Sequence, residues 1–133
     1  FVDVGLPSTV VPEQDFRQAI RPLLNHINDR KPDLLVVEAG ASPLEPYNGE
    51  ALFDELGDNI VCTILCASDP YSVVGVQKAF GVTPDLVTGP ATTTSAAVGL
   101  VKKLTGLAGI NILDPAMKQP FREFLFDKLK IAR

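Results

Sequence analysis

Residues 34–37 read Leu34-Leu-Val-Val37, four aliphatic side chains in a row that are followed at once by the acid Glu38. Similar apolar runs lie at residues 1–4, 60–65, 85–88 and 109–113. Continuous, rather than alternating, hydrophobicity is typical of strands whose two faces are both covered, as in a parallel sheet. We therefore expect five strands that lie side by side in one mostly parallel sheet.

Each apolar run is followed by a stretch with helical features, at residues 13–29, 48–56, 69–80, 94–104 and 120–130. In the first of these, Phe16, Ile20 and Ile27 recur with a helical period, and Pro22 should kink or split the helix. Strands that alternate with helices are typical of βαβ units, whose right-handed crossovers place helices against the sheet. We expect a single α/β domain over residues 1–133, three-layered and Rossmann-like, with about five strands and helices on both faces.

Composition narrows the class of protein. The chain has 133 residues, a formal net charge of −4 and 46% hydrophobic residues, which is ordinary for a globular domain and excludes a disordered acidic tail. An acidic balance argues against a nucleic-acid partner, and no apolar run approaches the roughly 18 residues of a membrane span. We expect a cytoplasmic protein. Because Phe1 stands inside an apolar stretch, we also expect a fragment of a longer chain.

The cysteines, Cys62 and Cys66, fall in one predicted strand. Residues four apart in a strand have Cα atoms about 13 Å apart, too far for a disulfide. We expect two buried thiols that pack as small hydrophobic groups.

Ligands of open parallel sheets bind outside the carboxyl ends of the strands. Glu38 stands at such an end with Gly40 two residues later, where an acid can face Mg²⁺ or its water shell; alternatively, Glu38 caps a turn. Asp3 is a candidate for a second catalytic acid, or else it is hydrogen-bonded to a loop.

Hydroxyl groups gather at two further strand ends. Thr92, Thr93, Thr94 and Ser95 open a predicted helix, whose free N–H groups can hold a phosphate or carboxylate. Threonine and serine are also ordinary helix caps, so both interpretations stay open. Ser8 and Thr9, which follow a Gly-Leu-Pro turn, carry the same two interpretations, and Asp69 is a ligand-binding candidate that also suits a helix cap.

The segment Val36-Val-Glu-Ala-Gly-Ala41 resembles the acidic strand end of P-loop NTPases of the dethiobiotin synthetase-like and MinD-like kind, and of uncharacterised putative P-loop ATP-binding proteins. Residues 1–9 resemble the strand and loop that follow the phosphate-binding helix of such proteins. The resemblance covers about residues 1–70, with Ala39 at a position that is usually glycine. It implies that Glu38 contacts the metal and that Asp3 lies near the γ-phosphate or a substrate.

The phosphate-binding motif of that family, Gly-x-x-x-x-Gly-Lys-Ser/Thr, does not occur in these 133 residues. We therefore expect ATP and Mg²⁺ to bind only together with a missing N-terminal segment, and we expect the chain alone to be inactive as an NTPase. The alternative is a noncatalytic Rossmann-like domain that binds a small anionic ligand or serves oligomeric assembly. We expect a homo-oligomer, because an exposed sheet edge at residues 1–4 would need cover.

Overall fold

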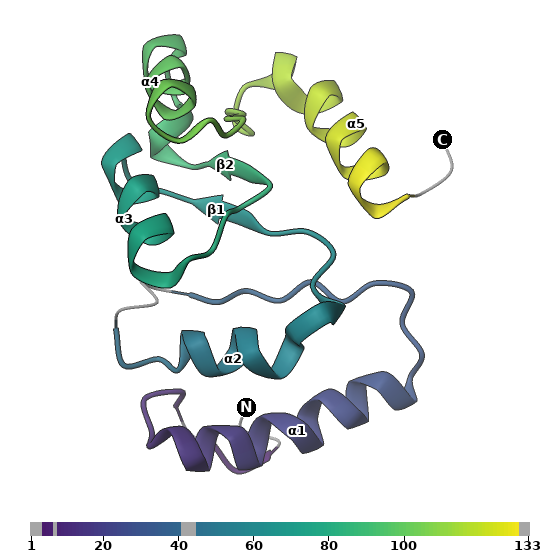
Figure 1. Ribbon diagram of the computed structural model, residues 1–133. Coiled ribbons are helices and arrows are strands. Elements are labelled where there is room, and N and C mark those ends of the chain that lie inside the picture. Colours follow the sequence, from purple (N-terminus) through teal and green to yellow (C-terminus); the bar gives the residue numbers. More distant parts are fainter. Residues whose placement is uncertain (1–3, 7, 41–44, 131–133) are drawn as a thin grey trace. The chain divides into compact units, whose positions relative to one another are not determined.

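A computed structural model describes residues 4–6, 8–40 and 45–130 of the chain (Figure 1). The chain divides into two compact units, Phe1–Asn59 and Ile60–Arg133. None of the described helices is both long enough and apolar enough to cross a membrane.

The first unit is built on two helices, α1 (Glu13–Asp29) and α2 (Gly49–Leu56), followed by the 3₁₀ turn η2 (Gly57–Asn59). Its core consists of buried apolar side chains from both helices and the preceding loop: Leu6, Phe16, Ile20, Ala51 and Leu52. The predicted period of α1 is confirmed, since Phe16 and Ile20 are its buried residues. The helix runs from Glu13 to Asp29 with Pro22 inside it, so it is not split at the proline.

Ion pairs hold α1 to α2 on the outer side of that core. Arg21 Nε lies 2.8 Å from Glu55 Oε2, and Arg17 reaches both Glu55 Oε1 at 3.2 Å and Asp54 Oδ2 at 2.9 Å. Arg17 also pairs with Glu13 of its own helix at 2.7 Å. The Glu55 side chain is only 10% exposed, so its ion pairs are less screened by solvent than those of a fully exposed pair.

The second unit contains two parallel strands, β1 (Ile64–Cys66) and β2 (Leu86–Thr88), in register Ile64↔Leu86, Leu65↔Val87 and Cys66↔Thr88. Beyond β2 a single parallel bridge joins Val87 to Gly109. The helices are α3 (Pro70–Phe80), α4 (Ser95–Thr105) and α5 (Lys118–Leu129), with 3₁₀ turns η3 (Pro90–Thr92) and η4 (Pro115–Met117).

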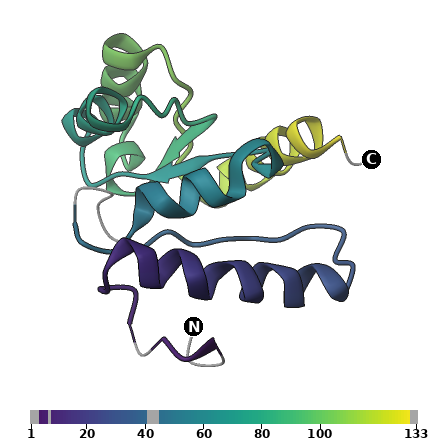
Figure 2. The same cartoon turned by 60° about the horizontal axis from the view of Figure 1, so that its bottom comes forward.

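The core of the second unit lies between the strands and two of these helices. Val87 packs there with Val73 of α3 and Val101 of α4, and none of the three side chains is accessible to solvent. Since α3 and α4 share this core, they cover the same face of the strands. In both views of the chain α5 lies apart from α3 and α4, across the strands (Figures 1 and 2).

The prediction of a five-stranded, three-layered Rossmann-like sheet is wrong. The described residues form one sheet of two strands. Residues 34–37 are in no strand, and their side chains are 41–85% exposed. Residues 60–65 contribute only the start of β1, residues 109–113 only the bridge at Gly109, and Val4 is in no strand, while residues 1–3 lie outside the described residues.

The physical reason is that an apolar run becomes a strand only where a neighbouring strand offers backbone partners. The backbone of residues 85–88 has hydrogen-bond partners on both sides. Thr63 and Ala67 lie on one side, and Ala108 and Ile110 lie on the other. For Leu34–Val37 no backbone partner is present among the described residues. The helices, whose hydrogen bonds are local, are confirmed with shifts of one or two residues at their ends.

The cysteines are free, as predicted, but their predicted burial is wrong for Cys66, which is exposed, while Cys62 is half-buried.

Candidate functional site

A small cavity in the first unit brings together three of the predicted site residues. It has a volume of about 60 Å³ and is lined by Thr9, Phe16, Glu38, Ala39, Gly40, Tyr47, Gly49 and Leu52. Thr9 lies on the loop that precedes α1, whereas Glu38 and Gly40, two residues apart, lie on the loop that follows it. Their shared cavity is the candidate site, and we call it the Glu38 cavity.

Asn48 does not line the Glu38 cavity, but it fixes the position of Thr9, which does. Its backbone is left-handed, with φ of 59°, and its side-chain amide donates hydrogen bonds to the carbonyl oxygens of Thr9 at 2.7 Å and Val11 at 3.0 Å. Asparagine tolerates this backbone conformation better than most residues. The Thr9 loop is thereby attached directly to the start of α2.

The N-terminus of α2 forms part of the same cavity, through its first residue, Gly49. Asn48 occupies the N-cap position, but its side chain makes no capping hydrogen bond, and its amide nitrogen donates to the Thr9 loop. The first N–H groups of a helix carry a partial positive charge that favours an anion. The Glu38 cavity therefore combines a carboxylate with a weakly positive helix end.

The acid and the glycine of the cavity lie close together. A Cβ atom built on Gly40 would lie 4.0 Å from Glu38 Oε1, an ordinary contact, and Glu38 itself is exposed. Gly40 is thus not required by the packing of the described residues. Its lack of a side chain leaves the backbone beside the carboxylate open to approach.

The donor set of the Glu38 cavity fits Mg²⁺ in part. A carboxylate and a hydroxyl group are oxygen ligands of the kind that Mg²⁺ prefers, and Mg²⁺ usually keeps its remaining positions for water and phosphate oxygens. No group of three or more His, Cys, Asp or Glu side chains that could hold a metal occurs among the described residues. About 60 Å³ has room for a cation and a few oxygen atoms but not for a nucleoside.

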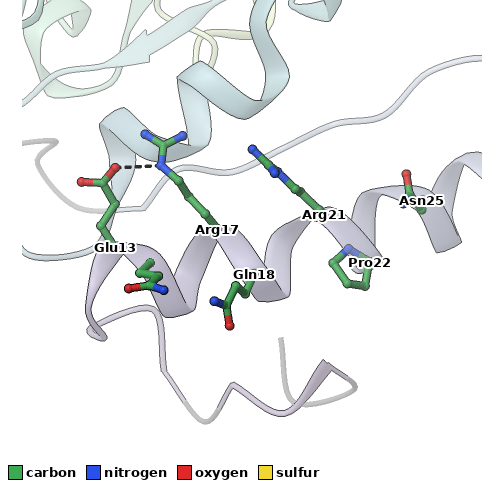
Figure 3. Close-up of a pocket in the computed structure, with 7 residues that line it drawn as sticks. Glu13, Arg17, Gln18, Arg21, Pro22 and Asn25 are labelled. Atoms are coloured by element: carbon green, nitrogen blue, oxygen red, sulfur yellow. Dashed lines mark hydrogen bonds and ion pairs between the residues drawn. The ribbon is translucent and has the colours of Figure 1, made fainter.

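A larger hollow of about 750 Å³ lies beside α1, lined by Glu13, Gln14, Arg17, Gln18, Arg21, Pro22 and Asn25 (Figure 3). All of its lining residues belong to one helix, and it contains none of the predicted site residues. The guanidinium groups on its wall are held by acids: Asp54, Glu13 and Glu55 raise the pKa of Arg17, and Glu55 raises that of Arg21. These groups join α1 to α2, so the hollow is a feature of the helix surface.

Asp69 is a helix cap, one of its two predicted roles. Its Oδ1 accepts hydrogen bonds from the amides of Tyr71 at 2.8 Å and Ser72 at 3.0 Å, and the Ser72 hydroxyl donates to the Asp69 carbonyl at 2.7 Å. The Ser68 hydroxyl, with these amides, lowers the pKa of the Asp69 carboxyl below its ordinary value. The bond from the Ser72 amide to Asp69 Oδ1, together with the Asp69 amide that donates to Ser72 Oγ at 3.4 Å, forms a capping box at the start of α3.

The hydroxyl groups of Thr92, Thr93 and Thr94 also have hydrogen-bond partners within the second unit. Thr92 Oγ1 is buried between the carbonyl oxygens of Gly89 at 2.9 Å and Ile110 at 3.0 Å, and Thr93 Oγ1 donates to the Pro90 carbonyl at 3.0 Å. Thr94 Oγ1 accepts from the Ala97 amide at 3.1 Å and caps α4.

Two more of the predicted site residues are exposed. Ser95 is the first residue of α4, and Ser8 Oγ accepts from the Val10 amide at 3.0 Å. Asp3 lies outside the described residues.

Sequence reasoning missed two positions that shape these loops. Gly89 has a φ of 83°, and a Cβ there would lie 2.9 Å from the Ala67 carbonyl oxygen, so only glycine fits. Asn48 was placed at a helix start, but its bonds to Thr9 and Val11 span 39 and 37 residues. The dipeptides Gly89-Pro90 and Asn48-Gly49 are turn signals that mark both positions in the sequence.

Comparison with known proteins adds no identity, since no family model, no curated protein and no solved structure matches the chain.

Proposed function

We propose that the Glu38 cavity is the metal and terminal-phosphate part of a nucleotide site, in a protein of the P-loop NTPase kind. The observation that carries the proposal is that Thr9, Glu38 and Gly40 line one cavity. The resemblance at residues 36–41 independently names Glu38 as the acid that contacts Mg²⁺. The phosphate-binding loop would come from a segment outside these 133 residues, and the chain by itself would not turn over ATP.

Electrostatics supports a cation in the Glu38 cavity. A phosphate at the N-terminus of α2 would meet the Glu38 carboxylate in a space of about 60 Å³, and two negative groups this close repel each other. A divalent cation between them removes the repulsion, and Mg²⁺ is commonly held by one or two carboxylates together with substrate phosphates. In this arrangement Glu38 holds the cation and Thr9 adds a hydroxyl ligand.

Metal titration tests the proposal. Mn²⁺, which substitutes for Mg²⁺ and is followed by electron paramagnetic resonance, would be titrated into the chain with and without inorganic phosphate, which stands for the terminal phosphate because the proposed nucleotide site is incomplete in these 133 residues. We expect phosphate to tighten Mn²⁺ binding, and we expect Glu38→Gln to weaken it about tenfold, the loss of roughly 1.4 kcal/mol. Glu45→Gln, an exposed acid of the same unit that does not line the cavity, is the matched control and should bind like the parent. Equal binding by parent and Glu38→Gln would refute the proposal.

The second candidate is a noncatalytic module that binds a small anion. The uncapped first turn of α2 at the Glu38 cavity favours it, because such a helix end attracts carboxylates and phosphates. The same variant separates the two candidates. Glu38→Gln removes a negative charge, so it strengthens the binding of free inorganic phosphate if the site takes an anion alone, whereas it weakens the binding of phosphate together with Mn²⁺ if the site takes a metal and a phosphate.

We also propose that the protein is cytoplasmic and forms a homo-oligomer. The free thiols of Cys62 and Cys66 fit a reducing compartment. The exposed aliphatic side chains of Leu34–Val37 fit a surface that is covered in an assembly. Light scattering of the purified chain tests the oligomeric state, and a monomer at all concentrations would refute it.

A further inference from the structure

Helix α5 is packed differently from the other helices of the second unit. Each of α3 and α4 buries a valine in the core, whereas none of the residues of α5, all of which the structure describes, is buried. Its aromatic and aliphatic side chains are half-buried at best. Since burial of apolar surface is the main force that docks a helix, α5 is held less firmly than its neighbours.

The far end of α5 is held by charge. Lys128 Nζ lies 2.6 Å from Asp85 Oδ1, and these side chains are 39% and 28% exposed. Asp85 is itself fixed, because its Oδ2 accepts a hydrogen bond of 2.8 Å from the Thr63 amide and its own amide donates to the Thr63 carbonyl at 2.8 Å. The ion pair therefore joins α5 to the point where the chain enters β1 and β2.

The near end of α5 is attached through an exposed turn. Residues 111–114 form it, with Ile112 44% and Leu113 82% exposed. The turn is closed by its own short-range bonds: the Leu113 amide donates to Asn111 Oδ1 at 3.1 Å, and the Asp114 amide donates to the Asn111 carbonyl at 3.1 Å. Such a turn can change its backbone angles without disturbing the core, as a hinge does.

The helix also carries contacts of its own that do not depend on docking. Gln119 donates to Glu123 Oε1 at 2.9 Å, and the Arg122 guanidinium lies 4.9 Å from the centre of the Phe126 ring. Both pairs have the i, i+4 spacing that stabilises a helix on its own surface. These contacts would persist when the helix leaves the strands.

From these four features we infer that α5 is a strap that opens about the turn at residues 111–114 and is closed by the Lys128–Asp85 ion pair. When α5 opens, it uncovers the residues just before β1. Cys62 is one of them, and it is next to Thr63, whose amide donates to Asp85. Cys62 is half-buried in the structure, which is the closed form. In the open form its thiol would become accessible. An ion pair this exposed is screened by salt, so ionic strength shifts the strap towards the open form.

Alkylation of the two thiols measures the opening. Cys66 is exposed already and serves as the internal reference. We expect Lys128→Met to raise the iodoacetamide rate of Cys62 by about two- to fivefold, the range of a surface ion pair, without changing the rate of Cys66. Lys128→Arg, which keeps the charge, should react like the parent, and so should Lys118→Met, which removes a lysine at the other end of α5.

If α5 stayed docked, the loss of the Lys128 charge would slow the alkylation of Cys62 instead of speeding it up, so the direction of the change decides the test. Burial and the Asp85 carboxylate raise the pKa of the Cys62 thiol, and the Lys128 ammonium partly offsets them. Removing that ammonium with α5 still docked would reduce the thiolate fraction and slow the alkylation of Cys62. A slower or unchanged Cys62 rate in Lys128→Met therefore refutes the strap, and so does a parallel rise at Cys66, which would indicate general unfolding. Amide hydrogen exchange that quickens in α5 but not in α4 would support it.

Discussion

The side-chain amide of Asn48 lies 2.7 Å from the carbonyl oxygen of Thr9, 39 residues away in the chain, and this bond attaches one wall of the Glu38 cavity to the start of α2. Asn48 does so from a left-handed backbone with φ of 59°. Its side chain and its backbone conformation are therefore both needed, and substitutions can separate them.

Asn48→Gly keeps the left-handed backbone and removes the amide. We expect it to lower the free energy of unfolding by about 1–3 kcal/mol, as for the loss of the two hydrogen bonds to Thr9 and Val11. Asn48→Ala should cost roughly 1 kcal/mol more, because alanine adds strain at positive φ. Urea unfolding of both variants measures the difference. If alanine proved no worse than glycine, the left-handed conformation of Asn48 would be contradicted.

The Glu55 carboxylate should make the stability of the first unit depend on pH. Hydrogen bonds from Arg21, and then from Arg17, lower the pKa of Glu55 below its ordinary value. A carboxyl whose pKa is depressed by folding stabilises the protein above its unfolded pKa of about 4.3, and this contribution is lost as the pH falls through the folded pKa. We expect the urea midpoint to fall as the pH drops below about 4.3, and to fall less in Glu55→Gln, which has no such carboxyl to protonate. Identical pH profiles for the two proteins would contradict the role of Glu55.

Two buried threonines should respond in opposite directions to the same substitution. The Thr88 hydroxyl has no hydrogen-bond partner in the part of the chain that the structure describes, whereas Thr92 Oγ1 lies within 3.0 Å of two carbonyl oxygens. Valine has nearly the same shape as threonine. Thr88→Val should therefore stabilise the protein by about 1 kcal/mol, and Thr92→Val should destabilise it by about 1–2 kcal/mol. Thermal unfolding of the two variants measures both effects. A loss of stability in Thr88→Val would show that the Thr88 hydroxyl has a hydrogen-bond partner.

Glycine at position 89 should be irreplaceable. An added Cβ would lie 2.9 Å from the Ala67 carbonyl oxygen, and the φ of 83° disfavours any side chain. We expect Gly89→Ala to cost about 2–4 kcal/mol, from steric overlap and strain combined. Gly99→Ala is the matched control, because nothing lies within 4 Å of its Cβ position inside α4 and alanine is the better helix former there. In Gly99→Ala we expect the free energy of unfolding to rise by up to about 1 kcal/mol. A similar loss of stability in both variants would contradict the close contact at Gly89.

The features predicted correctly from the sequence are those whose partners are close in the chain. Asp69 and Thr94 were both candidates for caps, and each binds amides two or three residues ahead. The strand predicted at residues 34–37 failed because a strand depends on partners far away in the chain, and hydrophobicity alone does not supply them.

The Glu38 cavity contains three residues that the sequence analysis selected, but two of them were selected for a reason that the structure contradicts. Glu38 and Gly40 were chosen because they follow a run expected to be a strand, yet the structure places them on a loop without strand pairing. They still share a cavity with Thr9, as a common site requires. The contact that brings Thr9 there comes from Asn48 across 39 residues, a distance at which no local pattern carries information.

Leu34–Val37 also has a consequence for handling the protein. Val36 is 85% exposed and Leu34, Leu35 and Val37 are each more than 40% exposed, in a stretch that is in no helix or strand and contains no proline. Short aliphatic segments of this kind can stack on identical segments of other molecules into fibrils. Concentrated samples should therefore form fibrils and become turbid over time, and Val36→Lys should prevent this.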